Sequence, residues 1–336
     1  MHLWFGLLFL NILTFFQETR VFTFVLQNTP HFNSRCLNEK FLPEKCVCKD
    51  NIAFVALECT NFTRLDDINK YFPELANKEH SMNKLVLIGA KLPFLPKLAL
   101  QCCFTKLTIQ ESYVQGLESA DSEFMFSELK DTFRELKVIR SKYMQLWSWE
   151  AFSALDSLTL LTVTESDMTL VPETFKKINS NSLSKLTLSK NYIKYIDEEA
   201  FAKFKKLMYF DISNNQIMSI SRKMFPQKDS LLREINFSNN RLENLPEDIF
   251  IGMNNIRKIN LANNKIKTLQ KKAFSEILEK LVELDVTGNQ IRCCKPLEWM
   301  LSLKEKGTSL KGRCHSPSNL RNKNIAQLTA QEICCC

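Results

Sequence analysis

Apolar residues recur in one fixed frame between Leu183 and Ile291. A row has apolar residues at its first, fourth, sixth and eleventh positions and Asn at its ninth, as in Leu183, Leu186, Leu188, Asn191 and Ile193. Side chains on a strand point alternately to its two faces, so the fourth to sixth positions predict a short strand with one buried face. Five rows start 24 or 25 residues apart, at Leu183, Leu207, Leu232, Ile256 and Leu281. Each of the first four is followed by a Phe expected in the outer half of the core: Phe201, Phe225, Phe250 and Phe274.

Four earlier rows, starting at Met82, Phe104, Phe133 and Leu158, keep the apolar frame but carry Ala or Ser at the Asn position. A repeat of this pattern and period is the leucine-rich repeat. The sequence therefore predicts an α/β solenoid, a leucine-rich-repeat horseshoe of nine repeats over residues 82–292, with a parallel sheet on its concave face. Asn at the ninth position is expected to bond backbone groups of the turn, and Ser to do so more weakly. Extra residues around 115–130 predict a longer outer loop.

The twelve cysteines cluster near the two ends of the repeats. Cys36, Cys46, Cys48 and Cys59 precede the repeats. Four cysteines allow three pairings, and a zinc site is the alternative that their irregular spacing disfavours. Residues 293–336 form a second cysteine-rich segment, which also contains Trp299. Its cysteines are Cys293, Cys294, Cys314 and Cys334–Cys336, whereas Cys102 and Cys103 lie before the second strand without an assigned partner.

These two cysteine motifs resemble the caps of extracellular leucine-rich-repeat proteins. The resemblance implies an N-terminal cap over residues 36–81 and a C-terminal cap over residues 293–336, in which Trp299 seals the end of the core on a short helix. The resemblance implies four disulfides: Cys36–Cys48, Cys46–Cys59, Cys293–Cys314 and Cys294–Cys334. The chain departs from the family pattern because Cys293 and Cys294 are adjacent, and because the partner of Cys294 stays open among Cys334, Cys335 and Cys336. The repeats are also similar to arthropod secreted repeat proteins, such as the non-catalytic subunit of the shrimp luciferin mono-oxygenase.

The first residues predict export from the cell. Residues 3–16 form an apolar run that is short for a membrane span, so residues 1–20 are interpreted as a signal peptide. Cleavage is expected within 16–20 or after the second apolar patch at 21–26, and a signal anchor is the alternative. Glycosylation sequons at Asn61 and Asn236 and the cysteine content agree with a secreted, extracellular protein. Strand alternation places Asn236, and Ser238 with it, outward on the concave face.

The residues predict no catalytic chemistry. None of the four histidines lies at metal-ligand spacing, and no nucleophile motif occurs, so we expect no enzyme activity, metal, cofactor or nucleic-acid partner. The net charge of +8 is spread widely. The basic clusters at 203–206 and 271–272 are interpreted as solvated convex turns, with an acidic-polysaccharide or membrane-surface contact as the alternative.

The concave face remains as the functional surface, because a broad rigid sheet suits recognition over a wide area. The expected anchors are Tyr209, Arg233 and Arg257, because aromatic and Arg side chains dominate binding hot spots. If a glycan occupies Asn236, binding is expected to move to the first four repeats, with Lys106, Arg134 and Lys137, or to the convex side. The function expected is a secreted, non-enzymatic module that binds an extracellular protein or matrix component. The alternative, implied by the luciferin mono-oxygenase similarity, is an accessory subunit that stabilises a secreted catalytic subunit.

Overall fold

The computed structural model describes residues 36, 42–50, 54–64, 83–95, 104–117, 126, 129–178 and 181–334. The chain divides into two compact units, Met1–Ser34 and Arg35–Cys336, and every described residue lies in the second unit. Several predictions fall outside the described residues: the signal peptide, residues 65–82 of the N-terminal cap and first repeat, most of the longer loop, Cys102, Cys103, Cys335 and Cys336.

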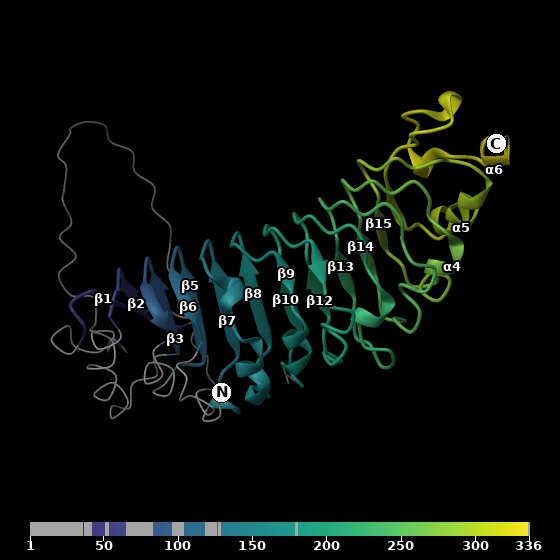
Figure 1. The fold of residues 1–336 in the computed structure, drawn as a ribbon. Coiled ribbons are helices and arrows are strands. Elements are labelled where there is room, and N and C mark those ends of the chain that lie inside the picture. Colours follow the sequence, from purple (N-terminus) through teal and green to yellow (C-terminus); the bar gives the residue numbers. More distant parts are fainter. Residues whose placement is uncertain are drawn as a thin grey trace, which may run out of the picture. The chain divides into compact units, whose positions relative to one another are not determined.

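A single sheet of twelve strands runs through this unit (Figure 1). Its first two strands pair antiparallel, and all later neighbours pair parallel. The predicted fold class, a leucine-rich-repeat solenoid, is confirmed. The strands in spatial order are β1 Cys46–Asp50, β2 Val55–Thr60, β3 Lys84–Ile88, β5 Lys106–Gln110, β7 Glu135–Ile139, β8 Leu160–Thr164, β10 Lys185–Thr187, β12 Tyr209–Asp211, β13 Glu234–Asn236, β14 Lys258–Asn260, β15 Glu283–Asp285 and β16 Ser309–Lys311.

The outer side of each repeat is made of short segments. These segments include two small parallel sheets that are separate from the main sheet. One pairs β4 Lys91–Phe94 with β6 Tyr113–Gly116, and the other pairs β9 Leu170–Val171 with β11 Tyr195–Ile196. The helices are η3 Met144–Leu146, η4 Trp149–Ala154, η5 Glu173–Lys177, η6 Arg222–Met224, α4 Lys271–Phe274, η7 Lys295–Leu297, α5 Trp299–Glu305, η8 Ser318–Leu320, η9 Ile325–Gln327 and α6 Ala330–Cys334.

An aromatic spine fills the outer half of the core, where the far-side phenylalanines of the sequence lie. Phe201, Phe225, Phe250 and Phe274 are all buried. Ring centroids lie 4.6 Å apart between Trp149 and Phe175, 5.9 Å between Phe201 and Phe225, and 5.3 Å between Phe250 and Phe274. Tilted aromatic pairs at such distances stabilise the core beyond the burial of their apolar area.

A ladder of buried polar side chains satisfies the turns that follow the strands. In the Asn rows, Asn215 Oδ1 accepts the Ile193 N–H at 3.0 Å, and its Nδ2 donates to the carbonyl of Leu188, in the preceding repeat, at 2.9 Å. Asn240, Asn264 and Asn289 bond in the same way. In the Ser rows, Ser141 Oγ accepts the backbone N–H of Ser112 at 3.2 Å. The amide groups of the turns are therefore paired without strand partners, as buried backbone groups must be.

The residue before each ladder position has a positive φ, which forms a second column along the solenoid. Glu111, Arg140, Glu165 and Lys190 adopt φ values between 48° and 55° in this column. Their charges alternate, with Arg140 2.8 Å from Glu111 and Lys190 3.2 Å from Glu165. The hydrogen bond from Arg140 lowers the pKa of Glu111, and that from Lys190 lowers the pKa of Glu165. These exposed pairs are screened by solvent and contribute little to stability.

Disulfides close both caps. Cys36 is bonded to Cys48 and Cys46 to Cys59 in the N-terminal cap, and Cys293 to Cys314 in the C-terminal cap; these are pairs that the family resemblance implies. Trp299, at the start of α5, stacks on Phe274 at 4.8 Å and donates its Nε1–H to the Leu269 carbonyl. Trp299 thereby covers the end of the aromatic spine.

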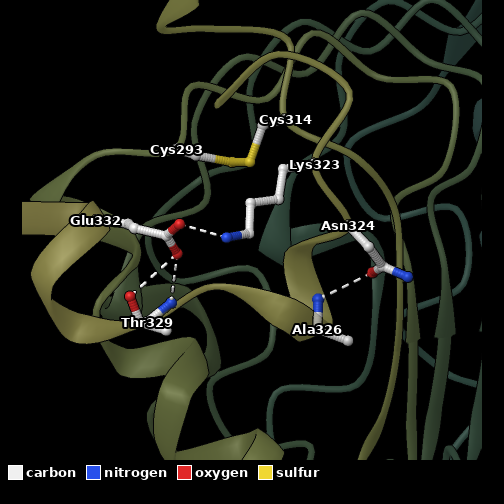
Figure 2. Close-up of a disulfide and its surroundings, with 7 residues drawn as sticks. All are labelled: Cys293, Cys314, Lys323, Asn324, Ala326, Thr329 and Glu332. Carbon is white, nitrogen blue, oxygen red and sulfur yellow. Dashed lines mark hydrogen bonds and ion pairs between the residues drawn. A yellow bond between two sulfur atoms is a disulfide. The ribbon is translucent and has the colours of Figure 1, made fainter. Parts of the chain in front are cut away.

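Polar contacts hold α6, the last helix of the C-terminal cap, in place (Figure 2). Glu332 accepts hydrogen bonds from the backbone N–H and the hydroxyl of Thr329, both at 3.0 Å, and forms an ion pair with Lys323. This capping arrangement satisfies backbone groups at the start of α6.

The expected Cys294–Cys334 disulfide is not formed: Cys294 is a buried free thiol, and the Cys334 side chain lies outside the described residues. The backbone is extended at Cys294, so adjacent side chains point to opposite sides. Cys293 points toward Cys314, whereas Cys294 lines a hollow beside Thr268 and Leu269.

Candidate functional site

A depression on the concave face lies over strands β10, β12, β13, β14 and β15. It is a shallow hollow of about 440 Å³. Its floor is the backbone of these strands, and its walls are the side chains that strand alternation directs outward. Because the strands are only three residues long, each contributes two outward side chains, one at its first position and one at its third.

The first outward column alternates in charge. The parallel register aligns Lys185 with Tyr209, Tyr209 with Glu234, Glu234 with Lys258, and Lys258 with Glu283. Lys258 Nζ lies 3.2 Å from a Glu234 carboxylate oxygen. Glu283 is paired with Lys311 in β16. Tyr209 is 40% exposed and stands between a cation and an anion, with its ring available for contact.

The second outward column is held in place by its own backbone. One side-chain oxygen of Asp211 accepts the N–H of Ser213 at 2.9 Å, and that of Asn236 accepts the N–H of Ser238 at 3.0 Å. Asn260 makes the equivalent bond to the Ala262 N–H. Such local bonds fix the side-chain conformation. The hollow therefore presents preorganised carboxylate and amide groups, and binding would order few additional side chains.

The first half of the concave face is more basic. Lys106 Nζ lies 2.8 Å and Lys137 Nζ 3.4 Å from the two oxygens of one carboxylate, that of Glu135. Burial opposes the charge of Glu135, but the hydrogen bond from Lys106 and the charge of Lys137 outweigh it and lower its pKa. Burial, reinforced by Lys137, lowers the pKa of Lys84 on the neighbouring strand β3. Two of the cations predicted to bind a partner are thus partly neutralised by Glu135.

The three residues predicted as binding anchors, Tyr209, Arg233 and Arg257, lie in two different parts of the sheet. Tyr209 lines the hollow, but Arg233 and Arg257 do not. Both arginines precede their strands by one residue, so they lie at the edge of the sheet, where Arg257 donates to the Ile256 carbonyl at 3.4 Å. Arg134 takes the same edge position before β7 and is exposed. The predicted cluster of Tyr209 with two arginines is therefore not a single site.

The two sequons lie in different surroundings. Asn61 is exposed, with a φ of 53°, at the edge of the N-terminal cap. Asn236 lines the hollow, as strand alternation predicts. The expectation that Ser238 also faces outward is wrong, because Ser238 is buried at 6% exposure. Strand β13 ends at Asn236, so the alternation stops before Ser238, which already belongs to the turn.

The sequence places Lys185, Asp211, Glu234, Lys258 and Glu283 on the concave face, but it does not by itself group them into one site. The signal is present in the repeat spacing, since aligning rows 24 or 25 residues apart puts Lys185, Glu234, Lys258 and Glu283 in one column and Asp211 in the other. Predicting the ion pairs and the hollow also requires the lengths of the strands, and the pattern of apolar residues does not determine those lengths.

Within the described part of the chain, no group of three or more His, Cys, Asp or Glu side chains is arranged to hold a metal ion. The described helices also include none that is both long and apolar enough to cross a membrane. The chemistry that the hollow offers is non-covalent: hydrogen bonds with fixed amides and carboxylates, ion pairs, and one aromatic contact.

Comparison with known proteins agrees with the fold. A family model described as "Leucine rich repeat" matches residues 181–231 and 230–291. Among solved structures, the chain is similar to one in an octameric complex of Latrophilin 3 (Lec, Olf), Unc5D (Ig, Ig2, TSP1) and FLRT2 (LRR), with a TM-score of 0.59 and 18% sequence identity. The similarity covers 86% of this chain and 98% of that one, and at this identity it shows the fold alone. No curated protein sequence matches the chain. Residues 181–291 thus carry leucine-rich repeats by sequence and by structure.

Proposed function

We propose that this protein is a secreted, non-enzymatic binding module that holds an extracellular protein partner in the concave hollow around Tyr209. The observation that carries the proposal is the hollow itself, which is lined by preorganised polar groups and one exposed aromatic ring. Aromatic residues enclosed by fixed polar groups commonly dominate protein interfaces. A fold neighbour occurs in a complex of several proteins, which supports the same class of function.

The chemistry of the hollow favours a partner with mixed charge. Lys185, Asp211, Glu234, Lys258 and Glu283 give it both signs, and a partner surface with alternating Lys, Arg, Asp and Glu would complement them. A strongly charged partner of one sign would meet repulsion from part of this set. The proposed partner is therefore a folded protein surface with a central apolar or aromatic contact for Tyr209.

Secretion and glycosylation belong to the same proposal. Three disulfides in the caps are typical of proteins that fold in an oxidising compartment. Asn61 is the proposed glycan site that leaves the hollow free. A glycan on Asn236 would fill the hollow, so mass spectrometry of the Asn236 peptide tests the binding site directly. Full occupancy there would move the proposed contact to Lys106, Arg134 and Lys137 in the first repeats.

The first step of the experiment is a pull-down of the secreted protein from its natural extracellular source. The partner that is captured with it is identified by mass spectrometry. Binding of that partner is then compared for wild type, Tyr209→Ala and a control, Tyr195→Ala, which removes a more exposed tyrosine from β11, outside the main sheet. Tyr209→Ala is expected to cost about 2 kcal/mol of binding free energy, and the control less than ~0.5 kcal/mol.

A partner that binds Tyr209→Ala with unchanged affinity would refute the proposed site. If the captured partner is an enzyme whose stability depends on this chain, the accessory-subunit alternative holds instead. Measuring the enzyme's thermal inactivation with and without the chain distinguishes the two functions.

A further inference from the structure

A row of cations lies on the flank of the last repeats, away from the concave hollow. After each ladder Asn the chain continues as an extended segment, in which Leu242, Ile266 and Ile291 point inward and are buried. Their neighbours point outward and are exposed. In repeats seven to nine these neighbours include Arg241, Lys265, Lys267 and Arg292, which we call the basic flank.

Backbone hydrogen bonds fix the spacing of the basic flank. The Lys265 N–H donates to the Leu242 carbonyl at 2.8 Å, and the Arg292 N–H donates to the Lys267 carbonyl at 2.9 Å. Successive segments therefore lie side by side, as neighbouring strands do, at a separation of about 4.8 Å. The basic flank is a short two-row array of cations on a rigid backbone.

The charge of the basic flank is largely uncompensated. Among the residues that the structure describes, none forms an ion pair with Arg241, Lys265, Lys267 or Arg292, although many other lysines of the chain are paired. Glu243 is the one acidic residue at the exposed positions of these three segments, and it lies at the N-terminal side of the row. The field of the remaining cations adds up over this surface.

The row ends at a second hollow, of about 280 Å³, between the last two repeats and the C-terminal cap. Arg292 belongs to both the basic flank and this hollow. Lys295 and Thr268 line the hollow as well, with Leu269 and the buried thiol of Cys294. None of its described lining residues is acidic. Two cations and a hydroxyl around one concavity suit a sulfate or carboxylate group, since guanidinium and ammonium groups form strong charge-assisted bonds to such anions.

From this arrangement we infer that the basic flank binds a linear sulfated polysaccharide, with one of its anionic groups seated in the hollow of Arg292 and Lys295. A linear polymer with charges repeated along its length matches a row of cations repeated at the strand spacing. This binding is independent of the concave hollow, so the protein holds a polysaccharide and a protein partner on different surfaces.

Other polyanions fit this surface less well. Attachment to a membrane usually combines cations with apolar anchors, and no exposed large hydrophobic side chain lies in the three segments of the basic flank. Nucleic acid is disfavoured because the disulfide-bonded caps are typical of proteins outside the cell. An extracellular sulfated polysaccharide remains as the polyanion that the location and the surface both allow.

The test uses the full secreted chain and heparin as the probe. Binding to immobilised heparin and to fully desulfated heparin is measured at about 0.15 M salt, where exposed charges farther apart than ~8 Å are screened. Two charge-matched double variants are compared, Lys267→Gln with Arg292→Gln on the flank, and Lys203→Gln with Lys205→Gln on the convex side. Each removes two positive charges from exposed positions. Circular dichroism melting curves verify that both variants are folded.

The flank variant is expected to bind heparin ~10- to 30-fold more weakly, and the convex variant within about twofold of wild type. Desulfated heparin should not bind. Equal losses in both variants would show attraction by net charge alone and overturn the inference. Binding to phosphatidylserine vesicles that depends on the basic flank, without binding to heparin, would also overturn the inference.

A second measurement needs no variant. Heparin should protect Lys265 and Lys267 of the wild-type chain from acetylation and leave Lys203 and Lys205 reactive. Equal reactivity of all four lysines with and without heparin would overturn the inference even if the flank variants failed to fold.

Discussion

Replacing Asn215 by Ala tests how far the polar ladder stabilises the solenoid. Asn215 is buried, with its Oδ1 bonded to the Ile193 N–H at 3.0 Å and its Nδ2 within 3.1 Å of the carbonyls of Leu188, Ile212 and Ser213. An amide nitrogen has two hydrogens, so these contacts amount to three hydrogen bonds in all. At about 1 kcal/mol each, their loss predicts ~3 kcal/mol of lost stability.

The partners left behind give a second estimate. After the substitution the Leu188 carbonyl keeps its bond from Asn191, and the Ile212 carbonyl keeps its bond from Asn240. The Ile193 N–H loses the only acceptor that the described structure gives it. One orphaned buried donor costs about 1–3 kcal/mol. Both estimates place the loss near ~2–3 kcal/mol.

Asn215→Asp separates the two ends of the amide. It keeps an oxygen for the Ile193 N–H but points a carboxylate at three carbonyl oxygens. We expect a larger loss than for Ala at neutral pH, because a buried charge would face only acceptors. Burial and the carbonyls raise the pKa of such a carboxyl, so its destabilisation should shrink as the pH falls and the group becomes a donor.

The assay combines guanidinium denaturation with hydrogen exchange of the peptide that contains Ile193. Gln216→Ala is the control, because the Gln216 side chain makes no hydrogen bond in the described structure; its cost should stay within ~0.5 kcal/mol. Exchange at Ile193 should accelerate in Asn215→Ala and not in the control. A stability loss below ~0.5 kcal/mol with unchanged exchange at Ile193 would refute the ladder reasoning.

Three further predictions concern other parts of the solenoid. The pKa of Glu135 is lowered in the folded state, so its ion pairs contribute stability at neutral pH that is lost on acidification. Glu135→Gln should therefore have a lower melting temperature than the wild type at neutral pH. As the pH falls, the melting temperature of this variant should decrease less than that of the wild type. Removing the Cys293–Cys314 disulfide by a double Ala substitution should cost about 3 kcal/mol, measured by denaturation under non-reducing conditions. Gly288→Ala should destabilise by ~1–3 kcal/mol, since φ is +70° and a Cβ there would lie 2.1 Å from Asn263 Oδ1; an unchanged denaturation midpoint would contradict this.

The fold could be predicted from the sequence because each repeat restates the same pattern. Leu186, Phe210 and Ile235 occupy equivalent positions in their rows, and the structure aligns them in register. A period that recurs with so few changes specifies strand order, pairing direction and buried face together. The aromatic spine could be predicted for the same reason, because Phe201 and Phe225 recur at one position of the repeat.

The details of the candidate site could be predicted only in part, because they depend on where each strand ends. The outward placement of Ser238 requires β13 to continue past Asn236, and the grouping of Arg233 with Tyr209 requires Arg233 to lie on the concave sheet. Arg233 lies one residue before the three-residue strand β13, and Ser238 lies two residues after it. Strand ends are set by competition between sheet bonds and turn bonds of similar strength. The apolar frame does not report on that competition.

The change from Ser to Asn in the ladder has a consequence for how such a chain can vary in length. Asn215, Asn240, Asn264 and Asn289 each reach back to the same two backbone groups of the preceding row. A row inserted or deleted within this block would find the same partners on both sides, so the block can tolerate duplication. Asn191 is different, because its oxygen accepts the N–H of Ser166 at the ladder position of a Ser row, while its nitrogen donates to Val163 in the manner of the Asn rows. Asn191 therefore acts as an adaptor between two incompatible modules, and a row exchanged across this junction would leave buried amides unpaired.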